Sequence, residues 1–421
     1  MSTPHISNFD LVVIGGGAAG FFTAIQFAEM RPASRIAILE AGVESLSKVR
    51  ISGGGRCNVT HACFDPEELV KYYPRGNKEL LGPFYHFGPQ QTVDWFTAHG
   101  VSLKTESDGR MFPVSNKSQS ITDCFEHCIK QYGIRFFLKK RAQEIKWVEE
   151  DERWNINADA EIFQSRFLLV SSGSDQRSWE ILKSIGHTLI QPVPSLFTFK
   201  IKDEVLNTLA GLSVPHATVK ILNTKFSEEG PVLITHWGLS GPGILKLSAW
   251  AARELFEHNY EFSISVNWIH SAESTTQESL LNYKNNHPKK LVSAHGLFDI
   301  PLRLWKYFCA QAGIADVKNW ADTQQKEITS LSKLLCNQIF EIKGKTTFKE
   351  EFVTAGGVAL QEINFKTFES KKCKNLFLAG EVLNIDALTG GFNFQAAWTG
   401  AAIAAEEMGK RMREFENELM S

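Results

Sequence analysis

The sequence predicts an α/β fold, with a discontinuous nucleotide-binding domain interrupted by an antiparallel β region and a small helical region. Three observations support this prediction. A glycine turn follows a buried strand near the N-terminus. Short β-like runs separated by turn residues occupy positions 197–268, and a polar, mostly helical segment follows at about 272–335. After residue 375, a buried strand and a long helix complete the first domain.

The N-terminal stretch FDLVVIGGGAAG, residues 9–20, places G-x-G-x-x-G directly after an apolar strand. Gly15 permits the tight turn, and Gly17 lets the backbone approach a pyrophosphate. Gly20 allows the following helix to pack closely on the strand. The spacing therefore predicts a phosphate-binding turn rather than an incidental glycine turn.

The elements after this turn complete a dinucleotide-binding fingerprint. The helix at 18–30 would direct its free N–H groups and the positive end of its dipole at the phosphates. Glu40 closes the next apolar run, at 35–39, twenty residues after Gly20. Its carboxylate can accept hydrogen bonds from a ribose hydroxyl.

Composition excludes several classes. The chain has 421 residues, 43% of them hydrophobic and 22% charged, and a net charge of −2. These values suit a globular protein of two or three domains and favour neither nucleic acid nor an anionic membrane as partner. No secretory signal and no apolar run of about 18 residues is visible, so we expect a soluble, cytoplasmic protein.

The seven cysteines do not form a disulfide framework. Cys124 and Cys128 are four residues apart on an expected helix, but no second ligand pair follows at a zinc-like spacing. We therefore expect reduced thiols and no metal site.

The remaining elements are predicted from periodicity and turn residues. The prolines at 192 and 194 make a stiff crossing between the first domain and the β region. Helices are expected at 66–100, 123–132, 244–254 and 393–415, and strands at 134–138, 146–148, 154–158, 167–170, 197–201, 217–222, 232–235, 261–268, 352–354 and 376–379. The predicted domains are 1–192 with 354–421 for cofactor binding, 193–270 with 336–353 for the inserted β region, and 271–335 for the helical region.

A second cofactor element lies near the C-terminus. The buried strand at 375–379 ends in Gly380 and Glu381, and GGFNFQAA at 390–397 opens the last helix. A strand ending in glycine and an acid can bind a ribityl hydroxyl near the middle of FAD. The helix N-terminus would face the pyrimidine end of the isoalloxazine, where negative charge gathers on reduction. NAD enzymes need no such distant element, so FAD is favoured over NAD as the cofactor. The alternative is that these residues are only a buried strand and a surface helix without a role in cofactor binding.

The stretch SGGGRCN, residues 52–58, is the third element. Three consecutive glycines allow the backbone to approach a flat ring, and Arg56 and Asn58 add polar groups. A flexible surface loop is the alternative, but the position soon after Glu40 favours cofactor contact. Cys57 has no CxxC partner, so packing or ring contact is favoured over a redox thiol.

Several blocks, in this order, closely resemble one bacterial family of FAD flavoproteins, the family that includes aminoacetone oxidase and the BaiN-type (YhiN-like) bile-acid enone reductases. The blocks are ISGGGRCNVT at 51–60, GHT at 186–188 with Pro192 and PSL at 194–196, THWGLSGP at 235–242, and AGEVL to TGGFN at 379–393. The resemblance spans nearly the whole chain. It implies a discontinuous, Rossmann-type FAD domain of the glutathione-reductase type, an inserted β-barrel-like domain and a small helical domain.

The resemblance also implies which residues contact FAD. The expected contacts are Gly15, Gly17, Ala18, Ala19, Gly20, Glu40, Ala41, Ser52, Gly53, Gly54, Gly55, Arg56, Cys57, Asn58, Ala142, Ser172, Gly173, Gly380, Glu381, Gly391, Phe392, Asn393 and Phe394.

The chain departs from the family pattern at two places. The segment 174–179 is shorter than the usual Gly- and Tyr-rich loop, so contacts from that loop cannot be transferred. Asn384 stands where family members often carry an Asp.

The sequence contains one dinucleotide fingerprint, so a dedicated NAD(P)H domain is not expected. The flavin would be reduced by its organic substrate or by NAD(P)H docking transiently. We expect an FAD-dependent oxidoreductase that moves a hydride between flavin N5 and a small organic substrate, either an amine or an enone. His236 is the candidate proton donor or acceptor; the alternative is that it caps the turn before the helix at 244–254.

Two alternatives belong to other classes: a flavin-bound RNA-modifying protein and a non-catalytic flavin-binding protein. The near-neutral charge argues against nucleic acid as partner. The oligomeric state and the identity of the substrate stay open.

Overall fold

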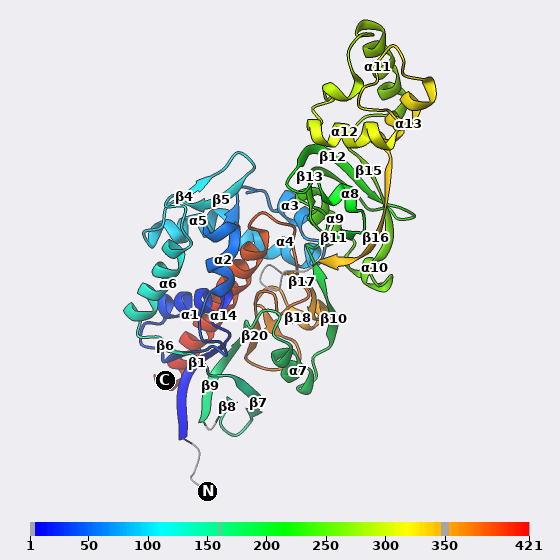
Figure 1. Ribbon diagram of the computed structural model, residues 1–421. Coiled ribbons are helices and arrows are strands. Elements are labelled where there is room, and N and C mark those ends of the chain that lie inside the picture. The colour runs from blue at the N-terminus through cyan, green and yellow to red at the C-terminus, as the bar shows by residue number, and fades with distance from the viewer. Residues whose placement is uncertain (1–4, 160, 347–352, 421) are drawn as a thin grey trace. The chain divides into compact units, whose positions relative to one another are not determined.

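The computed structural model describes residues 5–159, 161–346 and 353–420 (Figure 1). The chain divides into two compact units. Unit 1 comprises residues 1–192 and 353–421, and unit 2 comprises residues 193–352. Part of the predicted β segment 336–353, residues 347–352, lies outside the described residues. The predicted domain boundaries, with 271–335 as a separate helical domain, stay predictions.

Unit 1 is built on a twisted sheet whose central strands are parallel. Ile14 at the end of β1 pairs with Leu39 of β2 on one side and Val170 of β9 on the other, and Val170 also pairs with Leu378 of β20. The carboxyl ends of these four strands therefore meet at one edge, where α/β sheets bind ligands. The strand order is β18-β19-β20-β9-β1-β2-β6, with the β7–β8 hairpin joined to β9.

The strands of this sheet have the following bounds: β1 (His5–Ile14), β2 (Ile36–Leu39), β6 (Arg135–Phe137), β7 (Ala142–Val148), β8 (Arg153–Ala158), β9 (Glu161–Val170), β18 (Ile363–Asn364), β19 (Glu369–Ser370) and β20 (Leu376–Leu378). β9 begins six residues before the predicted strand at 167 because its first half pairs antiparallel with β8. The central strands are buried on both faces, as apolar parallel strands require.

Two helices from opposite ends of the chain pack against each other in unit 1. Small residues allow the close approach: Thr23 of α1 donates to the carbonyl of Ala401 (3.3 Å), and Met30 packs where a Cβ on Gly409 would lie. The helices are α1 (Ala18–Met30), α2 (Ser47–Gly55), α3 (Pro66–Leu69), α4 (Asn77–His86), α5 (Pro89–Ala98), α6 (Gln119–Gln131), α7 (Gln176–Ser184) and α14 (Phe392–Met420). A small sheet, β3 (Thr60–His61), β4 (Leu103–Thr105) and β5 (Arg110–Pro113), lies beside them.

Unit 2 contains a closed antiparallel barrel and a group of helices. The barrel confirms the predicted β-barrel-like region. Its order is β11-β14-β13-β12-β15-β16, and alternate side chains such as Val219, Ile221 and Ile264 fill its interior. The helical part buries Trp305 and Trp320. The elements are β11 (Thr198–Ile201), α8 (Glu204–Asn207), β12 (Ser213–Ile221), β13 (Ser227–Thr235), β14 (Gly238–Ser240), α9 (Pro242–Trp250), α10 (Ala252–Glu257), β15 (Glu261–Asn267), α11 (Glu273–Asn286), α12 (Leu302–Gln311), α13 (Gln325–Cys336) and β16 (Gln338–Thr346).

Strands β10 (Leu189–Ser195) and β17 (Val353–Val358) pair where the chain leaves and re-enters unit 1. A buried polar cluster fixes the unit 1 ends of these strands. His187 Nδ1 lies 2.9 Å from Glu362 Oε2, and His187 Nε2 lies 3.0 Å from Ser370 Oγ. Lys372 Nζ pairs with Glu362 at 2.6 Å. The spacing resembles a hydrolytic triad, but Ser370 Oγ also accepts two backbone N–H groups and is buried, so the cluster is structural.

The cluster predicts acid sensitivity. Burial lowers the pKa of His187 despite its bond to Glu362. Burial alone would raise the pKa of Glu362, but hydrogen bonds from Lys372, Thr188 and His187 together lower it to about 2. Both groups bind fewer protons in the folded state, so their stabilisation is present near neutrality. The stabilisation from His187 is lost as the pH drops below about 6.5, and the stabilisation from Glu362 is lost as the pH drops below about 4.3.

We expect His187→Gln to weaken the dependence of stability on pH between about 7 and 5. Only in the wild type does unfolding expose an imidazole that then takes up a proton which its buried, folded form does not bind. Urea unfolding at several pH values in this range measures the effect. An equal loss of stability on acidification in both proteins would assign the pH dependence to other groups.

Candidate functional site

The glycine turn after β1 has the geometry of a phosphate cradle. Gly15 has φ +109°, and a Cβ there would lie 2.6 Å from the carbonyl oxygen of Ser171. A Cβ on Gly20 would lie 2.1 Å from the carbonyl oxygen of Gly15, so the helix packs on the turn itself. A Cβ on Gly17 meets nothing within 4 Å. The N-terminal N–H groups of α1, at Ala18 and Ala19, follow this open space and have no acceptor within the helix.

Glu40 is fixed at the end of β2 by two backbone donors. Gly16 N donates to Oε2 at 2.8 Å, and Gly42 N donates to Oε1 at 2.6 Å. The carboxylate therefore lies between the glycine turn and the segment that contains Ala41. An ionised carboxylate has lone pairs left for further donors, so Glu40 can still accept from a ribose hydroxyl.

The C-terminal element lies at the same edge of the sheet. Gly380 has φ +79°, and a Cβ there would lie 3.4 Å from the Cβ of Ala19. Residues more than 350 positions apart thus meet at the start of α1. Glu381 accepts from Thr354 N (3.0 Å) and pairs with Lys48 of α2, which the sequence did not single out.

The predicted loop at 52–58 is an irregular turn that ends α2. Gly53, Gly54 and Gly55 all have positive φ, and a Cβ on Gly54 would meet nothing within 4 Å. The loop reaches the last helix through Asn58. With its amide nitrogen donating to the carbonyl of Thr60 (3.0 Å), the Asn58 oxygen accepts from Gly391 N (2.9 Å).

The side chains of Arg56 and Cys57 are engaged within the protein. Arg56 pairs with Glu106 at 2.5 Å and lies 3.9 Å above the ring of Phe112. Cys57 is buried, and burial raises its pKa to about 12. Its sulfur is a protonated thiol at neutral pH, which agrees with packing rather than redox chemistry. Any contact of these two residues with FAD stays a prediction.

The first turn of α14 lies in an aromatic stack that sequence reasoning missed. Phe392 stacks on Tyr72 (ring centroids 4.2 Å apart) and on His61 (4.6 Å). Asn393 braces the preceding loop, accepting from Ala387 N at 3.0 Å and donating to the Ala387 carbonyl at 3.1 Å. Phe394 stacks on Trp398. The sequence feature that could have indicated His61 is its position three residues after the end of the glycine loop at 52–58.

The remaining predicted residues lie around the same edge. The hydroxyl of Ser172 is buried and has no hydrogen-bond partner among the described residues, and the side-chain oxygen of Asn384 is also unpartnered there. Gly173 has φ +62° and lies beside Glu381. Ala142 begins β7, and the preceding residue, Arg141, pairs with the α7 N-cap Asp175 at 3.0 Å. An unpartnered hydroxyl beside an open glycine cradle fits a bound dinucleotide.

His236 lies in unit 2, on the turn between β13 and β14, apart in the chain from the FAD elements of unit 1. It is exposed and contacts Trp237 edge to face. The following helix, α9, begins after its N-cap Gly241 without a side-chain cap bond. The alternative in which His236 caps the turn before that helix stays a prediction. The catalytic role of His236 stays a prediction as well.

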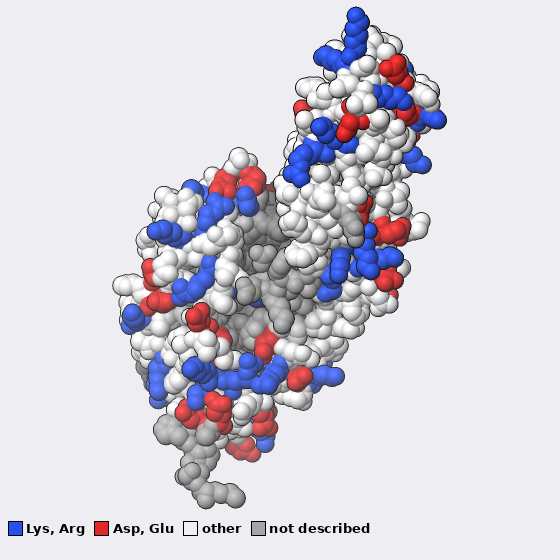
Figure 2. Space-filling view, in the orientation of Figure 1, with Lys and Arg blue, Asp and Glu red and all other residues white. Residues whose placement is uncertain are grey.

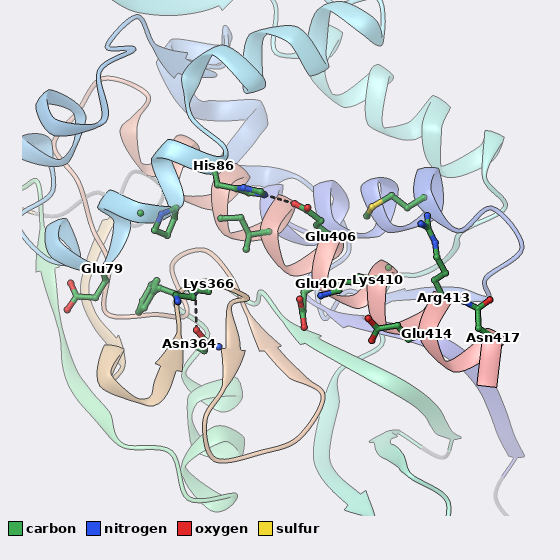
Figure 3. A pocket seen from close by; sticks show the side chains of 16 residues that line it. Glu79, His86, Asn364, Lys366, Glu406, Glu407, Lys410, Arg413, Glu414 and Asn417 are labelled. Carbon is green, nitrogen blue, oxygen red and sulfur yellow. Dashed lines mark hydrogen bonds and ion pairs between the residues drawn. The ribbon is translucent and has the colours of Figure 1, made fainter. Parts of the chain in front are cut away.

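A groove of about 1000 Å³ on unit 1 is separate from these residues (Figure 3). It lies between α4, α14 and the turn at 364–366, and its lining includes His86 and Glu406, whose Nε2 and Oε2 atoms are 2.5 Å apart. None of its lining residues belongs to the predicted FAD set. Within the described ranges, no cluster of three metal-ligating side chains occurs, and no helix is long and apolar enough to cross a membrane. The seven cysteines, all described, are free.

The geometry gives Glu381 and its partner Lys48 different expected roles. Glu381→Gln removes a charge-assisted acceptor, so FAD affinity should fall about tenfold or more, consistent with ~1.5–3 kcal/mol for such bonds. Lys48→Ala breaks only a half-exposed pair and should change affinity less than about fivefold. Quenching of flavin fluorescence on titration of apoprotein measures both. A larger effect from Lys48→Ala would make the lysine the direct ligand.

Comparison with known proteins identifies the family of the chain. The sequence model of the HI0933-like protein Rossmann domain matches residues 9–407. Among curated relatives, a ribosomal RNA dihydrouridine synthase of Haemophilus influenzae is 26% identical over 94% of this chain and 97% of its own length. A 3-dehydro-bile acid delta(4,6)-reductase of Clostridium scindens is 26% identical over 95% and 98%.

Solved structures support the fold alone. The quinol fumarate reductase FrdA of E. coli aligns with a TM-score of 0.51 at 13% identity, over 97% of this chain and 71% of that one. The 3-ketosteroid-delta4-(5alpha)-dehydrogenase of Rhodococcus jostii RHA1 also aligns with a TM-score of 0.51, at 11% identity, over 96% and 97%. These findings confirm a flavoprotein oxidoreductase with a Rossmann-type FAD domain. The chain belongs to the family of HI0933-like proteins with a Rossmann domain.

Proposed function

We propose that this FAD-dependent oxidoreductase reduces a carbon–carbon double bond conjugated to a carbonyl group. The observation that carries the proposal is the agreement between two relatives that each align along almost the whole chain. One is named as a 3-dehydro-bile acid delta(4,6)-reductase and the other as a ribosomal RNA dihydrouridine synthase. In both substrates a carbonyl polarises the double bond, so a hydride adds at the β carbon and a proton at the α carbon. We therefore favour reduction over amine oxidation.

The residues of unit 1 would hold and polarise the cofactor. The open cradle at Gly17 and the N-terminus of α1 suit the pyrophosphate, Glu40 suits the adenosine ribose, and Glu381 suits the ribityl chain. When bound, FAD accepts a hydride from a donor and passes it to the substrate. The N-terminus of α14 would stabilise negative charge on the reduced ring.

Two histidines are candidates for the proton donor. His61 is half-buried and stacked beside the first turn of α14 in unit 1, whereas His236 is exposed in unit 2. An imidazole titrates near neutral pH and suits this role. Each histidine can be replaced in turn. The proton donor is the one whose replacement shifts the pH profile of substrate reduction while the rate of flavin reduction stays unchanged.

We propose NAD(P)H as the electron source. Reduction of a double bond needs a hydride donor, and the single glycine fingerprint favours transient docking over a dedicated nucleotide domain. A nicotinamide docked in this way would supply the hydride that a bound FAD carries to the substrate.

Anaerobic stopped-flow spectroscopy tests the proposal. NADH or NADPH should bleach the flavin, and a cyclic enone should restore its oxidised spectrum. Bleaching by aminoacetone with no response to either nicotinamide would overturn the proposal in favour of amine oxidation. Repeated turnover would also exclude a non-catalytic flavin-binding role.

A second candidate is reduction of a uridine in RNA, favoured by the names of two relatives, from H. influenzae and E. coli. The uracil C5=C6 bond is conjugated to the C4 carbonyl, so the chemistry is the same and only the carrier of the ring differs. The near-neutral net charge argued against nucleic acid, but net charge does not describe individual surfaces.

A further inference from the structure

A short hairpin of unit 2 presents an exposed tryptophan. Trp237 lies in the turn between β13 and β14, and 47% of its surface is exposed. All ten tryptophans of the chain lie within the described ranges, and Trp237 alone among them is exposed. Nearly half of this side chain is therefore accessible for contact with a ligand, with the flat apolar face of an indole and a polar N–H at its edge.

The backbone that carries Trp237 is firmly held. Trp237 N donates to Thr235 Oγ1 (3.3 Å), and Thr235 Oγ1 donates to the carbonyl of Gly238 (3.0 Å). Ile201 N donates to the carbonyl of Trp237 at 2.9 Å. A Cβ on Gly238 would lie 2.2 Å from the carbonyl oxygen of Phe199, so the hairpin lies tightly on β11. Little backbone entropy would be lost when a ligand stacks on this ring.

Positive side chains follow the neighbouring strand. β11 places Lys200 opposite Gly238, with Phe199 and Ile201 buried in the barrel. Lys200 and Lys202 are therefore on the outer side, where both are exposed. Lys and Arg side chains gather over β11 and β16 in Figure 2, with acidic side chains beside them.

The acidic groups near these lysines are largely engaged elsewhere. Asp203 accepts from Leu206 N (2.8 Å) and from the hydroxyl of Tyr307 (3.2 Å). Glu261 of β15 is the register partner of Lys343 on β16, the strand on the other side of β11 from the hairpin. Lys200 and Lys202 are left as the cations closest along the strands to Trp237.

We propose that the hairpin-tip surface, formed by Trp237, His236, Lys200 and Lys202, binds an unpaired base and the adjoining phosphates of RNA. This inference rests on the second candidate function. An indole offers a stacking face that accepts any base, and ammonium groups beside it pair with phosphates. A small apolar substrate would instead be enclosed in a concave pocket, whereas this surface is open and cationic.

Fluorescence anisotropy with the FAD-loaded full chain and a labelled, U-rich single-stranded RNA of about 12 nucleotides tests the proposal. Trp237→Ala should weaken binding about 5- to 100-fold, and Trp237→Phe should restore most of the affinity because it keeps a stacking face. Phe64→Ala removes an equally exposed aromatic ring from unit 1 and should leave binding unchanged. In the double variant Lys200→Ala, Lys202→Ala, the slope of log Kd for RNA against the logarithm of the salt concentration should fall by about one to two.

The outcomes are separable from those of the proposed function. No RNA binding by the wild type, or equal binding by Trp237→Ala, overturns the inference while leaving reduction of an enone intact. Binding of a small cyclic enone that depends on Trp237, without RNA binding, assigns the surface to a small substrate and also overturns it. RNA binding that depends on Trp237, with a flavin that no enone or RNA reoxidises, would refute the proposed function alone.

Discussion

Gly15→Ala is expected to destabilise the apoprotein by about 2–5 kcal/mol. The φ of +109° is unfavourable for a residue with a Cβ, at a cost of ~1–2 kcal/mol. The added methyl would also lie 2.6 Å from the carbonyl oxygen of Ser171, and overpacking of this kind costs about 1–3 kcal/mol. The sheet cannot relax easily because Ile14 is paired on both sides. Urea unfolding followed by circular dichroism measures the loss.

Gly133→Ala is the matched control for Gly15→Ala. Gly133 has φ +63°, and a Cβ there meets no atom within 4 Å, so only the backbone cost of ~1–2 kcal/mol applies. The difference between the two variants isolates the clash with Ser171, which follows β9. Equal destabilisation of the two proteins would show that the turn after β1 is looser than described.

Gly17→Ala should have the opposite effect: the stability of the apoprotein should be nearly unchanged, and the affinity for FAD should fall. Gly17 has φ −94°, which alanine adopts readily, and the new methyl meets nothing within 4 Å. The unfolding free energy of the apoprotein should therefore change by less than about 1 kcal/mol. The methyl fills space that we assign to the pyrophosphate, so FAD affinity should fall about 100-fold, equivalent to ~2.7 kcal/mol.

Titration of apoprotein with FAD, followed by flavin fluorescence, measures the effect of Gly17→Ala. Gly133→Ala again serves as control and should bind FAD like the wild type. Unchanged affinity in Gly17→Ala would move the pyrophosphate away from the glycine turn. The pair Gly15 and Gly17 thus separates the structural glycine from the ligand-facing one.

The sequence predicted those parts of the site that depend on local geometry. Gly15, Gly17, Gly20 and Glu40 each have a role set by a turn, a strand end or a helix start, and these can be read from spacing. The sequence assigned Gly380 and Ala19 to one cofactor site, and the structure brings them together because parallel strands end at one edge. Short β-like runs separated by turn residues predicted the β region, whereas the closure of the barrel was implied only by the family resemblance.

Contacts between distant side chains were not predictable in the same way. The pair Lys48–Glu381, the bond between Asn58 and Gly391, and the stack of His61 on Phe392 each join segments hundreds of residues apart. No local periodicity encodes such contacts, because they follow from packing of the whole unit. The exposure of Trp237 was missed for a related reason, since a tryptophan in a β region is usually buried.

The measurement that most directly tests the central claim is the stoichiometry of FAD binding to apoprotein. We expect one FAD per chain, with binding weakened by Gly17→Ala at the N-terminal segment and by Glu381→Gln at the C-terminal segment. Sensitivity at both ends would show that one cofactor spans the two parts of unit 1. No uptake of FAD by the wild type, or binding indifferent to both substitutions, would contradict the account.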